Sequence, residues 1–160
     1  MPEKKTKILI VEHDFSSRNC TTKGIFASLG RLAERGFEIH VWANTWEEHD
    51  SITSVRKIPA LARPWFLRYL TFILSANLIG LRERLRPGRG ALGGYDVIHT
   101  SNGLFLQANL STFHFSEFTW VLTQLKRVPP RSLRDIYEFA TSVMASFSVS
   151  YTHLTLPTNG

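Results

Sequence analysis

The chain has 160 residues, a net charge of +6 and 43% hydrophobic residues, a composition typical of one soluble globular domain with a real core. Its one cysteine, Cys20, excludes an internal disulfide framework and favours the cytoplasm, and the charged start of the chain does not resemble a signal peptide. The positive charge is concentrated between Arg56 and Arg89, where eight basic residues accompany one acidic residue, so the overall charge predicts no binding of nucleic acid.

The first 42 residues predict a strand, a helix and a second strand. Residues 7–11 are an apolar, β-branched run, as expected for a strand buried on both faces of a parallel sheet. Apolar residues then recur with helical spacing between Thr22 and Arg35, Gly36 suits a left-handed C-cap, and residues 37–42 alternate as a strand. So short a unit predicts a right-handed parallel crossover. The expected fold class is therefore α/β, a Rossmann-like parallel sheet with flanking helices.

The polar residues after the first strand are the first candidates for a binding site. Sheets of this kind hold their ligands beyond the carboxyl ends of the strands. Glu12, His13 and Asp14 begin a predicted polar loop at such an end, so they are candidates for binding a substrate.

The next segment, residues 43–50, predicts a solvated loop, although it contains four consecutive potential metal ligands, Glu47, Glu48, His49 and Asp50. Adjacent residues on one loop do not converge on a single ion, so we predict no metal site. Residues 52–58 are expected to form a third strand, which Pro59 ends.

Residues 64–86 predict a long helix that is apolar around most of its circumference. Residues 69–81 carry no charge, but these 13 residues are too few to span a bilayer, which needs ~20. Two interpretations remain open. The helix packs in the core, or the segment from Arg56 to Arg89 lies on an anionic membrane as a basic amphipathic helix.

Two later predicted strands place further candidate residues at the carboxyl edge of the sheet. Residues 95–100 predict a strand, and Asn102 lies in the turn that follows it. Residues 110–115 predict another strand, which would bring His114 to the carboxyl edge beside the residues after the first strand. Asn102 is therefore a candidate for substrate binding and His114 a candidate catalytic residue. Helices are expected at residues 119–128 and 133–147.

The last residues resemble something other than a protein family. The segment from Val149 to Thr158 resembles the translation of a transposase adapter that is used to prepare sequencing libraries. We therefore expect residues 149–160 to be a non-native, disordered tail, and the natural protein to continue past Phe147. Residues 1–148 are then one incomplete domain.

Residues 7–147, taken in order, resemble the N-terminal half of a family 4 glycosyltransferase with the two-domain GT-B fold. Residues 7–11 match the family's first strand, and residues 32–41 are similar to its passage L-A-x-x-G-H-E-V. Residues 95–99 resemble its Y-D-V-I-H strand, and His114 stands where the family often has a histidine at the interdomain cleft. Residues 131–147 resemble the helix that follows.

This resemblance implies a retaining enzyme that moves a sugar from a nucleotide-sugar donor to an acceptor glycan or lipid, without a cofactor. The present domain would hold the acceptor, and a missing C-terminal domain would bind the donor, so the chain would be inactive alone. His114 would orient or polarise hydroxyl groups. The basic segment would hold the enzyme on the inner face of a membrane that carries a lipid-linked acceptor.

One departure from the family pattern lies in the first loop. The family usually has a Gly-Gly pair there, which lets backbone N–H groups approach the donor phosphates. Residues 16–23 contain no glycine, and Gly24 is the only one nearby. The resemblance therefore suggests that Arg18 or Lys23 supplies charge to the substrate instead.

Three alternatives are weighed against this interpretation. Residues 8–14 resemble the opening of a receiver-like signalling module, but that module needs a phosphoacceptor aspartate at the end of its third strand, and Asp50 ends a polar loop. A non-catalytic protein that binds a membrane surface is the second. A dinucleotide-dependent oxidoreductase is disfavoured because no G-x-G-x-x-G follows the first strand.

Overall fold

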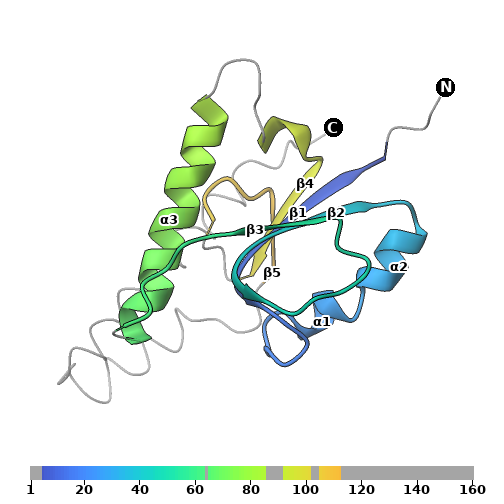
Figure 1. Cartoon of the computed structure of the whole chain (residues 1–160). Coiled ribbons are helices and arrows are strands. Elements are labelled where there is room, and N and C mark those ends of the chain that lie inside the picture. The colour runs from blue at the N-terminus through green and yellow to red at the C-terminus, as the bar shows by residue number, and fades with distance from the viewer. Residues whose placement is uncertain (1–4, 64, 86–91, 102–104, 113–160) are drawn as a thin grey trace, which may run out of the picture.

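The structure, a computed structural model, describes residues 5–63, 65–85, 92–101 and 105–112. Five strands form one all-parallel sheet in the order β3-β2-β1-β4-β5, which confirms the predicted α/β fold (Figure 1). The strands are β1 (Lys7–Phe15), β2 (Glu38–Trp46), β3 (Ser54–Lys57), β4 (Val97–Ser101) and β5 (Leu110–Thr112). This order places β1 between β2 and β4, so the direction of strand succession reverses between β1 and β4.

The strand order decides against the receiver-like alternative. A receiver domain has the order 2-1-3-4-5, in which the third strand lies beside the first. Here β3 pairs with β2 at one edge of the sheet, and β4 takes the place beside β1. The chain is therefore doubly wound in the order typical of nucleotide-binding folds.

Helices cover both faces of the sheet. Helix α3 (Trp65–Leu85) lies on one face, and the short helices α1 (Lys23–Phe26) and α2 (Leu29–Glu34) lie on the other (Figure 1). Alternate residues of β1 point to opposite faces of the sheet. Leu9 and Val11 pack toward α3, whereas Ile8 and Ile10 pack toward α1 and α2. Because both faces are covered, β1 is buried on both sides, as the apolar run predicts.

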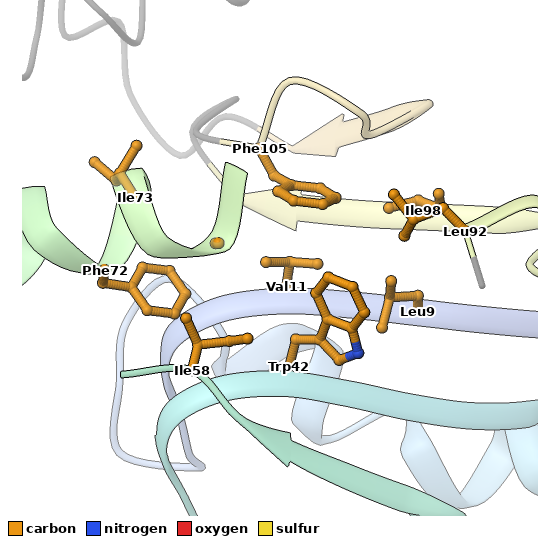
Figure 2. Close-up of a cluster of buried hydrophobic side chains, with 10 residues drawn as sticks. Leu9, Val11, Trp42, Ile58, Phe72, Ile73, Leu92, Ile98 and Phe105 are labelled. Atoms are coloured by element: carbon orange, nitrogen blue, oxygen red, sulfur yellow. The ribbon is translucent and has the colours of Figure 1, made fainter. Parts of the chain in front are cut away.

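The core on the α3 side is the larger of the two layers. Figure 2 shows the Phe72 ring of α3 pointing toward Ile58 and Val11, and Ile73 and Phe105 belong to the same cluster. The edge of the Trp42 ring faces Phe105, with ring centroids 6.0 Å apart. The core-packing interpretation of the long helix is thus confirmed for one of its faces. No helix in the described ranges is both long and apolar enough to cross a bilayer.

The first helical segment differs from the prediction of one helix up to Arg35. It is divided into α1 and α2, which end and begin around Ala27 and Ser28. The Ser28 hydroxyl donates to the carbonyl of Gly24 at 2.9 Å, a local bond that competes with continuous helix geometry. Helical periodicity alone therefore did not reveal the break.

The predicted C-cap at Gly36 is confirmed. Its φ is +82°, in the left-handed region that favours glycine. The Gly36 N–H donates to the carbonyl of Ala33 at 2.9 Å, and the Phe37 N–H donates to that of Leu32 at 3.1 Å. These two bonds form a Schellman motif, which ends α2 and turns the chain into β2.

The predicted polar loops after residues 11 and 42 are wrong at their beginnings. Strand β1 continues to Phe15 and β2 to Trp46, and the two pair as far as Phe15 opposite Trp46. Glu12, His13 and Asp14 therefore lie within β1. The two extensions satisfy each other's backbone groups, and the fully buried ring of Phe15 anchors the end of β1.

Strand β5 runs parallel to β1 through β4, as predicted for the segment that begins at residue 110. The expected helices at residues 119–128 and 133–147, and the tail from residue 149, lie outside the described residues.

Candidate substrate site at the carboxyl edge of the sheet

The ends of β1, β2 and β4 form a stepped edge. Strand β1 pairs with β4 only up to Val11 opposite Thr100, but it pairs with β2 four residues farther, up to Phe15. The last residues of β1 therefore project beyond β4 at the point where the strand order reverses. This switch point is where open parallel sheets bind ligands.

Glu12 lies at this switch point and is buried. Its carboxylate accepts a hydrogen bond from the backbone N–H of Ser101, so it joins the end of β1 to the end of β4. Burial raises the pKa of Glu12 to about 7, although the hydrogen bonds from Ser101 act in the opposite direction. The carboxyl group thus gains or loses a proton near neutral pH.

His13 lies between β1 and α3. Its ring meets Tyr69 and Phe72 edge-on, with centroids 5.6 and 5.4 Å apart. Its Nε2 atom is shielded from solvent and has no hydrogen-bond partner among the described residues. Burial lowers the pKa of His13, the positive charge of Arg68 lowers it further, and Asp14 partly opposes them. The ring is therefore held in its neutral form at neutral pH.

Asp14 helps to fasten the segment that follows β1. Its side chain accepts a hydrogen bond from the hydroxyl of Thr45 at 3.1 Å, and its carbonyl accepts one from the Asn19 amide at 2.7 Å. The Thr22 hydroxyl donates to the carbonyl of Ser16 at 2.8 Å. These bonds define the path of the chain between β1 and α1.

The other predicted site residues are not joined to this group in the structure. Arg18 and Lys23 are exposed, and among the described residues no hydrogen bond or ion pair links them to Glu12, His13 or Asp14. Asn102 and His114 lie outside the described residues, so their roles remain predictions. Glu12, His13 and Asp14 follow one another in β1, and successive side chains of a strand point to opposite faces of the sheet.

Two residues at this edge were missed by the sequence analysis. Arg68 of α3 donates to the side-chain oxygen of Asn44 through Nε at 3.2 Å and Nη2 at 3.0 Å. The Asn44 amide in turn donates to the carbonyl of Ile58 at 3.0 Å. The sequence feature that could have identified Arg68 is its position as a single arginine in the apolar part of the predicted helix. Its partner Asn44 was predicted to lie in a solvated loop.

One cavity of about 200 Å³ in the described part of the chain lies elsewhere, at α2, among Ser28, Arg31, Leu32 and Arg35. It is open to solvent and does not contact the residues at the carboxyl edge. No group of three histidine, cysteine or acidic side chains in the described ranges could hold a metal ion. At the ends of β1 and β2 the described side-chain hydrogen bonds link Arg68 to Asn44 and Asp14 to Thr45.

No family model matches the sequence, and no curated protein matches it. Among solved structures, the chain is similar to the crystal structure of WaaG, a glycosyltransferase involved in lipopolysaccharide biosynthesis, with a TM-score of 0.54 and 12% identity. The match covers 86% of this chain and 35% of the WaaG chain, so the present chain spans about a third of the structure it matches. This likeness shows the fold, that of a domain of a GT-B glycosyltransferase.

Proposed function

We propose that this chain is the acceptor-side domain of a glycosyltransferase that uses a nucleotide-sugar donor, and that the whole enzyme is a retaining member of family 4. The observation that carries the proposal is the doubly wound parallel sheet, which matches a glycosyltransferase over most of this chain. The polar residues at its switch point support a ligand site there. A fold alone hosts many functions, so the experiment below tests the reaction itself.

In the proposed reaction, the bond between the sugar and the donor diphosphate breaks, and a bond from the sugar to an acceptor hydroxyl forms. Catalysis then requires that the leaving diphosphate be stabilised and that the hydroxyl be held in position. We assign the positioning of hydroxyl groups to His114, with Asn102, Glu12, His13 and Asp14 as further contacts. A second domain of the whole enzyme would bind the nucleotide.

The test uses the full-length gene product, read from source DNA by long sequencing reads. We test it with a panel of uridine and guanosine diphosphate sugars. We expect it to hydrolyse at least one of these donors or to transfer its sugar to an acceptor. No turnover of any donor would contradict the proposal. The same reads decide on the tail, because codons for residues 151–157 in source DNA would show that the tail is native.

Arg18 provides a sharper prediction within the same proposal. It is exposed on the segment after β1, and we propose that it contacts a donor phosphate. Arg18→Ala is expected to weaken donor binding by about tenfold, because a charge-assisted hydrogen bond to phosphate is lost. The measurement is calorimetric titration of the full-length protein with the donor. Arg31→Ala, which removes an exposed arginine of α2, is the matched control. Equal affinities in both variants would remove this role from Arg18.

We also propose that α3 lies against an anionic membrane. Four exposed leucines follow one another at positions 74, 78, 81 and 85, spaced for one helical face. Arg82 and Arg84 beside them are exposed, whereas Glu83, the one acid of the helix, is buried and paired with Arg56 at 3.1 Å. Among the described residues of α3 the outward charge is therefore basic, which complements anionic lipid.

Liposome flotation tests this association. We expect the chain to float with vesicles that contain anionic lipid and not with neutral ones, and we expect Leu78→Asp to abolish flotation. Because Leu78 is largely exposed, this variant should keep its fold. Absence of flotation with either lipid would leave α3 as a core helix only.

A further inference from the structure

We propose that Arg68, held by Asn44 beside His13, forms a binding site for a phosphate group at the carboxyl edge of the sheet. This inference rests on the proposed function in one respect: the phosphate would belong to a substrate of the sugar transfer. The ligand chemistry itself follows from the side chains and their surroundings.

The positive charge of Arg68 is not balanced by a carboxylate among the described residues. Arg68 is partly buried where α3 meets the sheet, and the described ion pairs do not include it. The described ion pairs use Glu38 and Glu83, which lie elsewhere. A partly desolvated cation is costly unless a counter-charge meets it, so the geometry favours a bound anion.

The guanidinium of Arg68 is held in a fixed orientation by Asn44. Of the five N–H groups of a guanidinium, the two that are engaged converge on the same Asn44 oxygen. Asn44 is itself fixed by its bond to the carbonyl of Ile58, so it acts as a rigid brace. The three remaining N–H groups of Arg68 have no partner among the described residues. A planar fork held in this way suits bidentate binding of phosphate.

His13 lies beside Asn44, the residue that holds Arg68. Glu12 lies opposite Ala43 and Asp14 opposite Thr45, so His13 and Asn44 are next to each other on adjacent strands. The Nε2 atom of His13 is a buried ring nitrogen without a partner among the described residues. An unsatisfied buried polar atom is unfavourable, and a phosphate oxygen is a group that could satisfy it. Cation, brace and histidine thus gather at one place.

The charge of Arg68 acts on His13, and this provides a readout of the site. A phosphate bound to Arg68 would compensate its charge, so the pKa of His13 should rise when phosphate binds. Asp14 is the other charge that acts on His13, and phosphate binding leaves it in place. NMR titration of the His13 ring protons against pH, with and without inorganic phosphate, measures this effect in the 160-residue chain.

We expect phosphate to raise the pKa of His13 in the wild-type chain and to have no effect on it in Arg68→Gln. Phosphate affinity should fall at least about tenfold in Arg68→Gln. Arg68→Lys, which keeps the charge without the fork, should bind with intermediate affinity. Arg82→Gln, which removes an exposed arginine from the same helix, is the control and should match the wild type. Phosphate binding that Arg68→Gln and Arg82→Gln weaken equally would overturn the proposal, as would no binding to the wild type.

Two further titrations identify the source of the phosphate. The first replaces inorganic phosphate with a sugar phosphate, and a rise in the pKa of His13 would assign the site to the acceptor. The second uses a nucleoside diphosphate, and a rise in the pKa of His13 there would assign the site to the donor. Both experiments measure binding without sugar transfer. A full-length enzyme that transfers sugar although Arg68 binds no phosphate would remove only this inference. Phosphate binding without any transfer would remove only the proposed function.

Discussion

The wild-type chain is expected to lose about 3 kcal/mol of stability as the pH rises from 4.5 to about 7, because of Glu12. The Glu12→Gln variant should not show this loss. In the unfolded chain this carboxyl group has its ordinary pKa of 4.5, whereas burial raises the pKa to about 7 in the folded chain. Between these values the folded state holds a proton that the unfolded state has released. Stability from this group is therefore complete below pH 4.5 and is lost as the pH rises through 7.

Urea denaturation of both proteins from about pH 4.5 to about pH 8 measures the effect as a difference in the free energy of unfolding. The difference should grow with pH in favour of Glu12→Gln, since the neutral amide still accepts the Ser101 N–H bond. His13 acts in the opposite sense: its lowered pKa makes the folded chain lose stability as the pH falls below 6.5. Because both proteins contain His13, this contribution cancels.

Glu48→Gln is the control for the removal of a carboxylate, since Glu48 is exposed on the segment after β2. This variant should not reproduce the gain in stability with rising pH that is expected of Glu12→Gln. If Glu12→Gln behaves in the same way, Glu12 does not hold a proton in the folded chain.

Gly80→Ala is expected to destabilise the chain by about 1–3 kcal/mol, although alanine is the better helix former. A Cβ atom at Gly80 would lie 2.7 Å from Cζ and 2.8 Å from Cε2 of Phe105, and 2.9 Å from the Gln107 side-chain oxygen. Gln107 has a flexible side chain and can move away. The Phe105 ring is 2% exposed and packs against Trp42, so its displacement disturbs the core (Figure 2).

Gly30→Ala is the matched control, because a Cβ atom at Gly30 of α2 would have nothing within 4 Å. There the substitution should stabilise the chain by about 0.5–1 kcal/mol through helix propensity alone. Thermal unfolding measures both effects: the melting temperature should fall in Gly80→Ala and rise in Gly30→Ala. Adding Phe105→Leu to Gly80→Ala should recover part of the loss, since the shorter side chain leaves room for the new methyl group. Similar melting temperatures for the two alanine variants would show that α3 and the turn at Phe105 are not in close contact.

The candidate site was found only in part from the sequence. The rule that ligands bind at the carboxyl ends of parallel strands led directly to Glu12, His13 and Asp14. It could not identify Arg68 and Asn44, which lie 24 residues apart in different elements. Nor could it show that Glu12 meets Ser101, 89 residues away, because that contact depends on which strand takes the place beside β1.

The sequence by itself determined the elements whose causes are local. The apolar run at residues 7–11 specified a buried strand, and Gly36 specified the end of a helix because its left-handed φ suits a residue without a Cβ atom. Only the tertiary structure decided how far β1 and β2 extend, since each extension is stabilised by backbone groups of the other strand. It also decided the protonation of Glu12, because burial between distant segments, and not the residue type, raises its pKa.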